Sequence, residues 1–231
     1  MLVTINNLLS TDELVTARRL LQQSQWSPGQ MSAGIQAAQV KNNQQLPENA
    51  EHLPALRQLV LDALNRSAVF FAATLPLKIL PPFFNRYTGD TNTYGLHTDN
   101  AMRLVPNHND TNGIYVRSDV SATLFLSDPQ DYDGGVLSID DTFGTHGIKL
   151  TAGSLVVYPS SSTHAVTAVT RGERVACFMF LQSMVRDPGK RRLLYEMDMA
   201  LLKLRCEVGE TEPVVQLTGT YHNLLRRWAE S

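Results

Sequence analysis

The segment Tyr94-Gly95-Leu96-His97-Thr98-Asp99 carries an imidazole and a carboxylate two positions apart. On an extended chain, residues two apart point to the same face, so His97 and Asp99 can reach one metal ion. The pair alone is a weak signal, because a His-x-Asp pair is more often a hydrogen-bonded surface pair than a metal site. A third ligand must come from elsewhere, and His164 is the best candidate because it opens a predicted strand late in the chain.

Two histidines and one carboxylate hold a metal ion from one side and leave its opposite side open. That arrangement suits Fe(II) in oxygenases, in which a co-substrate and O2 need adjacent free positions. A catalytic zinc ion also takes two histidines and a carboxylate, but it needs only one open position, for water. The three residues therefore predict an Fe(II) site, with His97, Asp99 and His164 as metal ligands at the catalytic centre.

Arg174 follows His164 by ten residues and precedes an almost wholly apolar segment, residues 175–181. The turn at residues 170–173 reverses the chain, which predicts that Arg174 sits inside the β core, within reach of the iron-binding strand. Burying a guanidinium is costly unless an anion pairs with it. The distal carboxylate of 2-oxoglutarate is such an anion, because a guanidinium fork binds a carboxylate through two parallel hydrogen bonds. A structural ion pair with Glu173 or a nearby Asp is the alternative.

A second His-x-Asp pattern, His108-Asn109-Asp110, competes with the pair at His97. It lies within a turn-like composition at residues 106–110, so its side chains are expected in solvent. Three further histidines have no partner at ligand spacing and are predicted to be surface or helix residues: His52, His146 and His222. Tyr87 has two equal interpretations, a core aromatic and a contact to the co-substrate.

Short apolar runs separated by turn residues fill the middle of the chain. Runs of this length and spacing predict a β-sandwich, barrel or jelly roll. The predicted strands are Leu77–Tyr87, Gly113–Val116, Ser121–Leu126, Gly135–Ile139, Thr145–Leu150, Ser154–Tyr158, Ala165–Val169 and Arg174–Gln182.

Helical patterns stand on both sides of this β region. Ser10 and Glu13 form a capping-box pair before apolar residues at helical spacing, and residues 53–65 have one apolar face. Residues 29–50 have little periodicity and are predicted to be a long loop or a lid. Asp187-Pro188 predicts the start of a C-terminal helix, and a last helix is predicted over about residues 214–228.

These patterns predict a mainly β protein with a jelly-roll core and helices at both ends. The predicted parts are an N-terminal helical and loop segment (1–76), the core (77–184) and a C-terminal helical extension (185–231). The apolar stripes of the extension can pack on the core or on a second subunit, which leaves a homo-oligomer open.

Composition narrows the class of partner. The chain has 231 residues, 43% of them hydrophobic, and a formal net charge of −2, so it lacks the basic excess typical of nucleic-acid binders. It has two cysteines without metal-like spacing, which favours a reducing compartment. The N-terminus has no basic region before an apolar run, and no run approaches membrane-spanning length. A cytoplasmic protein without membrane or nucleic-acid partners is expected.

The chain resembles a known class in the order of its motifs. It is similar to the Fe(II)/2-oxoglutarate dioxygenases of the prolyl 4-hydroxylase-like class through Tyr87, Gly89, His97-Thr98-Asp99, Asp133-Gly134-Gly135-Val136-Leu137, Gly153-Ser154-Leu155, His164 and Arg174. It resembles the bacterial PKHD-type hydroxylases in particular through Phe84-Asn85-Arg86-Tyr87, His97-Thr98-Asp99-Asn100-Ala101 and Thr170-Arg171-Gly172-Glu173-Arg174-Val175.

The resemblance implies a double-stranded β-helix, Fe(II), 2-oxoglutarate, and ascorbate (vitamin C) as reductant. It implies His97, Asp99 and His164 as iron ligands and Arg174, with Tyr87, as the 2-oxoglutarate site. The implied reaction is hydroxylation of a small-molecule or peptidyl substrate by O2, with decarboxylation of 2-oxoglutarate to succinate and CO2. Members are often associated with bacterial iron uptake, which suggests a role in iron homeostasis.

Three other functions compete with this one. A nucleic-acid demethylase on the same fold would want a basic groove and stacking aromatics, and the strand after Arg174 lacks a second Arg within six residues. A cupin-type lyase or isomerase would recruit additional His or Glu ligands and would not need Arg174. A non-enzymatic sensor would bind iron and 2-oxoglutarate and transform neither.

Overall fold

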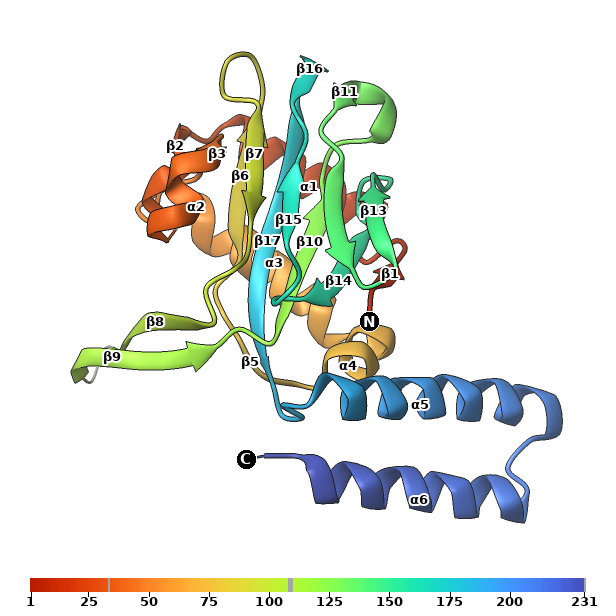
Figure 1. Cartoon of the computed structure of the whole chain (residues 1–231). Helices are drawn as coiled ribbons and strands as arrows, with labels where there is room; N and C mark the ends of the chain where they lie inside the picture. The colour runs from red at the N-terminus through yellow and green to blue at the C-terminus, as the bar shows by residue number, and fades with distance from the viewer. Residues whose placement is uncertain (33, 108–109, 231) are drawn as a thin grey trace.

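Two antiparallel β-sheets face each other in the computed structural model, which describes residues 1–32, 34–107 and 110–230 (Figure 1). The larger sheet has the order β1 (Val3–Ile5), β14 (Leu155–Pro159), β10 (Val120–Phe125), β17 (Arg174–Ser183), β6 (Phe83–Tyr87), β4 (Gln44–Gln45) and β2 (Ser27–Pro28), and β5 (Pro76–Ile79) also pairs with β17. The smaller sheet has the order β13 (Gly144–Ile148), β12 (Leu137–Asp141), β15 (His164–Val166), β7 (Thr93–His97) and β3 (Lys41–Asn42).

Two further strand pairs lie at the ends of these sheets. They are β11 (Tyr132–Gly134) with β16 (Val169–Gly172), and β8 (Met102–Asn107) with β9 (Asp110–Arg117). The β8–β9 pair projects away from the sheets (Figure 1). Antiparallel strands from separate parts of the chain, closed into two facing sheets, are the arrangement of a jelly roll, which confirms the predicted mainly β fold.

The side chains of β17 alternate between the two faces of the larger sheet. Cys177, Met179 and Leu181 point to the outer face of the larger sheet and join the core beneath the helices. Arg174 and Phe178, an even number of positions away from each other, point inward and line a pocket between the sheets. The apolar contacts between the sheets come from both of them, with Tyr87, Phe125 and Leu137 among the buried residues.

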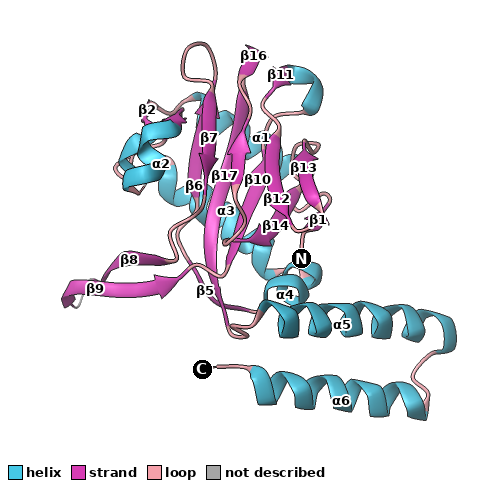
Figure 2. Ribbon diagram, viewed as in Figure 1, coloured by secondary structure: helices cyan, strands magenta, loops and turns pink. Residues whose placement is uncertain are grey.

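Helices cover the outer face of the larger sheet (Figure 2). They are α1 (Thr11–Gln22), α3 (Leu53–Asn65) and α4 (Ala68–Thr74). The predicted capping box is confirmed, because the Ser10 hydroxyl accepts from the Glu13 N–H and the Glu13 carboxylate accepts from the Ser10 N–H. The bounds predicted for the second helix, residues 53–65, are those of α3.

The C-terminal helices form an antiparallel hairpin, α5 (Pro188–Val208) and α6 (Glu212–Trp228), that extends from one end of the core (Figure 1). Asp187 caps α5 by accepting from the Lys190 N–H, as the Asp-Pro start predicted. The buried guanidinium of Arg191 donates to the carbonyls of Val185 and Arg186, which ties α5 to the end of β17. None of the helices in the described ranges has the length and apolar character to cross a membrane.

The prediction of a loop over residues 29–50 is wrong. This segment contains a 3-10 turn (Gly29–Ser32), α2 (Ile35–Val40), β3 and β4. Strands of two residues leave no periodic pattern, and their hydrogen bonds come from distant strands, since β3 pairs with β7 and β4 with β6. Another 3-10 turn, Pro129–Asp131, precedes β11.

Gly134 stands at a bulge between β11 and β16 with a φ of +71°, where a Cβ atom would overlap the carbonyl of Ala168. We expect Gly134→Ala to lower the free energy of unfolding by about 2 kcal/mol or more, through left-handed strain and this overlap. Gly219→Ala in α6 is the matched control, because its Cβ meets nothing within 4 Å, and it should raise stability by about 0.5–1 kcal/mol. Urea denaturation measures both, and equal stability of the Gly134 variant and wild type would contradict the prediction.

Candidate active site

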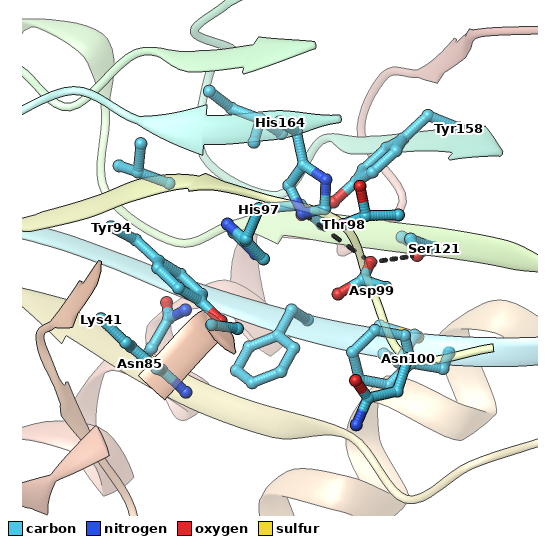
Figure 3. A pocket seen from close by; sticks show the side chains of 18 of the residues that line it. Lys41, Asn85, Tyr94, His97, Thr98, Asp99, Asn100, Ser121, Tyr158 and His164 are labelled. Carbon is cyan, nitrogen blue, oxygen red and sulfur yellow. Dashed lines mark hydrogen bonds and ion pairs between the residues drawn. The ribbon is translucent and has the colours of Figure 1, made fainter. Parts of the chain in front are cut away.

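The pairing of β7 with β15 brings the predicted metal ligands together. His97 and His164 are Cα partners in this antiparallel ladder, and side chains directly opposite each other in such a ladder lie within about 5.5 Å at Cβ. Asp99 follows β7 by two residues and points to the same side (Figure 3). One ligand atom from each of His97, Asp99 and His164 lies within 4.8 Å of the others.

Backbone carbonyls orient both imidazoles. The Nδ1 atoms of His97 and His164 lie 2.8 Å from the Gly95 carbonyl oxygen and 3.0 Å from that of Ser162. A carbonyl oxygen only accepts, so each Nδ1 must carry the hydrogen, which leaves Nε2 as the free nitrogen of a neutral ring. Burial lowers the pKa of His97 to about 4, so the His97 ring is neutral at pH 7. The Tyr94 ring stacks on His97 with centroids 3.7 Å apart.

A serine pair orients the carboxylate. The Ser121 hydroxyl donates to Asp99 Oδ2 over 2.7 Å (Figure 3). Ser160 Oγ lies 2.8 Å from Ser121 Oγ, and because the Ser121 hydrogen is already used, Ser160 is the donor in this bond. The same Asp99 oxygen lies 3.7 Å from His164 Nε2, which leaves it facing the free imidazole nitrogens.

The donor set has the composition and arrangement expected for Fe(II). Two imidazole nitrogens and one carboxylate oxygen converge from the neighbouring ends of β7 and β15, and the pocket lies beside them. Within the described part of the chain, no other group of His, Cys, Asp or Glu side chains is arranged to hold an ion. His146 pairs only with Asp141, on the surface, and the competing His108-Asn109 lies outside the described residues.

Arg174 lines the same pocket, at the start of β17 and opposite Tyr87 of β6. The residue is 1% exposed, and its guanidinium carbon lies 5.1 Å from the Tyr87 ring centroid and 5.2 Å from that of Phe125. Its Nε and Nη2 atoms are buried without a hydrogen-bond partner among the described residues. The ion pair with Glu173 is not formed, since the Glu173 carboxylate lies 3.5 Å from Arg86. A buried cation with two idle donors fits an anionic ligand.

Tyr87 is both a core residue and a pocket residue. It is buried between the sheets, and its hydroxyl oxygen accepts from Asn85 Nδ2 over 3.3 Å. Burial raises the pKa of Tyr87, so the phenol stays protonated. Its own hydrogen is therefore available to donate into the pocket beside Arg174.

Among the pocket residues that the sequence did not identify as site residues are Lys41, Tyr94, Arg103 and Ser121. Ser121 had a usable signal, because Ser121 and Thr123 are polar residues at alternate positions of a predicted buried strand. Lys41 had none, since it lies in the segment predicted to be a loop. Arg103 follows Asp99 by four residues but lies in β8, the first strand of a hairpin that was not predicted as a whole.

Comparison with known proteins identifies the family. Residues 82–182 match the 2OG-Fe(II) oxygenase superfamily, and residues 189–230 match the PKHD-type hydroxylase C-terminal domain. A PKHD-type hydroxylase of Nitrosomonas europaea is 68% identical over the full length of both chains, and one of Azoarcus sp. is 66% identical over the same extent. This chain belongs to the PKHD-type hydroxylases. It is thus a 2-oxoglutarate-dependent oxygenase, as the resemblance of its motifs predicted.

Solved structures agree with the fold of this PKHD-type hydroxylase. HygX from Streptomyces hygroscopicus, with nickel, 2-oxoglutarate and hygromycin B bound, has a TM-score of 0.52 at 15% identity and covers 77% of this chain and 81% of its own. A Trichoplax adhaerens prolyl hydroxylase in complex with a hypoxia inducible factor peptide has a TM-score of 0.53 at 18% identity, covering 84% and 86%. Both likenesses support the jelly-roll core of the oxygenases.

The environment of Lys41 in this hydroxylase is unusual for a lysine. The residue is 3% exposed, its Nζ donates to Gln45 Oε1 over 3.1 Å, and it lies 5.4 Å from the ring centroids of Tyr94 and Phe178. Burial, together with the charge of Arg103 and against the opposing effect of Asp99, lowers the pKa of Lys41 to about 8. The protonated ammonium is therefore held at a cost to stability.

We expect Lys41→Met to raise the free energy of unfolding of the metal-free protein at pH 7 by about 1–3 kcal/mol, less than the full shift implies because the bond to Gln45 is also lost. The unfolded lysine titrates near pH 10.4, so the unfolded chain binds more protons between about pH 8 and 10. The free energy of unfolding of the wild type therefore rises relative to that of the variant between about pH 8 and 10. Urea denaturation from pH 7 to 10 measures the gap, the exposed Lys78→Met is the control, and a gap that stays constant contradicts the shift.

Proposed function

We propose that this chain hydroxylates a small-molecule or peptidyl substrate, with iron held by His97, Asp99 and His164 and 2-oxoglutarate held by Arg174. The observation that carries the proposal is the guanidinium of Arg174, buried with two unused donors in the pocket that the three iron ligands share. A dicarboxylate that reaches from the metal to Arg174 would satisfy those donors and compensate the buried charge.

The chain's own residues supply orientation and a dry site. The Gly95 and Ser162 carbonyls hold the two imidazoles with Nε2 toward Asp99, and Ser121 fixes the carboxylate. The Tyr87 hydroxyl, protonated and already accepting from Asn85, donates to the carboxylate that Arg174 binds. Iron with 2-oxoglutarate and O2 supplies the oxidative decarboxylation to succinate and CO2 and the oxygen atom delivered to a C–H bond. Asp99 favours this hydroxylation, since halogenating oxygenases of the class have a small residue there.

The physiological setting belongs to the same proposal. Ascorbate as reductant and a role in bacterial iron homeostasis rest on the family resemblance. A cytoplasmic location rests on the two cysteines without metal-like spacing and on the N-terminal composition, and a homo-oligomer rests on the apolar stripes of the C-terminal helices. Both substrate types are compatible with the fold, because HygX was solved with hygromycin B and the Trichoplax enzyme with a peptide. Against a nucleic-acid demethylase stands the formal net charge of −2.

Anaerobic addition of Fe(II) and 2-oxoglutarate tests the metal site. We expect a weak visible metal-to-ligand absorption band in the wild type and its loss in His97→Ala, because one imidazole ligand is removed. His146→Ala is the matched control, since this histidine is exposed and distant in the chain from the proposed ligands. A band that survives His97→Ala, or fails to form in the wild type, contradicts the assignment.

The formation of succinate under air without added substrate then separates an enzyme from a sensor. An enzyme that slowly decarboxylates 2-oxoglutarate without substrate forms succinate, whereas a sensor does not.

Arg174→Met tests the co-substrate site. We expect 2-oxoglutarate binding to weaken by about 2–3 kcal/mol, roughly 30- to 150-fold, with iron affinity nearly unchanged. The variant without ligands should be at least as stable as the wild type, because an uncompensated buried charge is removed. Arg171→Met is the control. Arg171 lies three positions before Arg174, is exposed, and pairs with Asp133. Equal loss of iron and 2-oxoglutarate binding, with loss of stability, would instead make Arg174 a structural residue.

A further inference from the structure

The pocket contains more positive charge than the proposed reaction uses. Lys41, Arg103 and Arg174 line it, and Asp99 is the carboxylate among the lining residues. If Fe(II) and 2-oxoglutarate bind as proposed, their charges cancel, and the charges of Asp99 and Arg174 also sum to zero. An excess of positive charge then remains around Lys41 and Arg103, in surroundings where unbalanced charge is costly.

The guanidinium of Arg103 is held against an aromatic ring in the pocket and does not extend freely into solvent. Its guanidinium carbon lies 3.4 Å from the ring centroid of Phe180, which fixes the plane of the group and leaves its N–H edges free. The Nε atom is buried and has no hydrogen-bond partner in the described ranges. Nη2 is 3.9 Å from Asp99 Oδ1, beyond hydrogen-bond distance. Arg103 thus forms a long ion pair with Asp99 through Nη2 and keeps its buried Nε donor unused.

Lys41 provides a second cation on the side of the pocket that Phe178 and Phe180 form. Phe178 and Phe180 are two positions apart on β17 and point to one face, and Lys41 lies over the first ring as Arg103 lies over the second. Burial and the charge of Arg103 lower the pKa of Lys41, while the charge of Asp99 acts in the opposite direction, as expected for two cations that share one nearby carboxylate.

This pair of cations is separate from the proposed site for the distal carboxylate. Arg174 and Phe180 are six positions apart on an extended strand, roughly 20 Å at about 3.3 Å per residue. A five-carbon diacid that binds Arg174 with its distal carboxylate does not bring that carboxylate to Arg103. We assign the anion that Arg103 would bind to another molecule, and the 2-oxoglutarate affinity of an Arg103 variant tests this assignment.

We propose that the primary substrate carries a carboxylate, which Arg103 binds with the ammonium of Lys41 beside it. A carboxylate matches the planar N–H edge of a stacked guanidinium. Because Arg103 is 3.9 Å from a proposed iron ligand, the C–H bond that is hydroxylated lies close to that carboxylate along the substrate. This inference rests on the proposed function and specifies its substrate class as organic acids or peptides with an acidic group.

Paired probes test the charge preference on the anaerobic Fe(II)–2-oxoglutarate complex. Isothermal titration calorimetry compares N-acetylglycine with N-acetylglycinamide, which has the same shape without the charge. A second pair, a capped Gly-Asp-Gly peptide and its Gly-Asn-Gly counterpart, presents the carboxylate on a side chain. We expect the acid of at least one pair to bind roughly ten- to a hundredfold tighter than its amide. The pair that shows the preference tells whether the carboxylate is a chain end or a side chain.

Variants assign the preference to the residue. Arg103→Met should abolish it, Arg103→Lys should retain part of it, and 2-oxoglutarate affinity should change less than threefold in both. Arg57→Met is the matched control, because Arg57 also lies over an aromatic ring, Phe83 at 5.8 Å, but pairs with Glu48 and is not among the residues lining the pocket. It should keep the wild-type preference.

Three results would overturn the inference. They are equal or undetectable binding of acid and amide in both pairs, a preference that survives Arg103→Met, and an Arg103→Met variant that loses 2-oxoglutarate affinity, which would make Arg103 part of the co-substrate site. Failure of the proposed function is a different observation, since the metal-to-ligand band would then be absent before any probe is added.

Discussion

The burial of Arg174 is the constraint on which the site depends. A guanidinium enclosed at the start of β17, with Nε and Nη2 unpaired, is costly in a protein of ordinary stability. The surrounding aromatic faces of Tyr87 and Phe125 stabilise it only weakly, because cation–π contacts contribute about 0.5–2 kcal/mol each. Under the proposed function, a dicarboxylate that binds there would satisfy these donors and offset the cost of burying the guanidinium.

The register of β7 and β15 is the second constraint. His97 and His164 meet because they are directly opposite in the ladder, and a slip of one residue would turn His164 to the other face. The irregularity between His164 and Val166 and the carbonyls of Gly95 and Ser162 fix the final orientation. Ligand geometry is thus a product of strand pairing, while the carboxylate, just beyond the strand, needs Ser121 to hold it.

Local patterns predicted what depends on neighbours in the chain. The capping box at Ser10 and Glu13, the helix at residues 53–65 and the Asp187 cap all follow from side chains within a few positions of each other. The three proposed ligands and Arg174 were found because their types and spacing are rare together. Lys41 and Arg103 were not found, because they reach the pocket through β3 and β8, whose partners are far away in sequence or in an unpredicted hairpin. Residue type alone does not distinguish them from surface cations.

The depth of the two arginines in the pocket has a kinetic consequence under the proposed function. Arg174 is 1% exposed, whereas the side chain of Arg103 keeps 18% of its surface in contact with solvent. A molecule seated on Arg103 would stand between bulk water and the deeper cation. Binding is then ordered: 2-oxoglutarate binds to the empty enzyme first, and the primary substrate binds second. Excess primary substrate would bind enzyme that does not yet hold 2-oxoglutarate and block its entry. Turnover would therefore fall at high concentrations of the primary substrate.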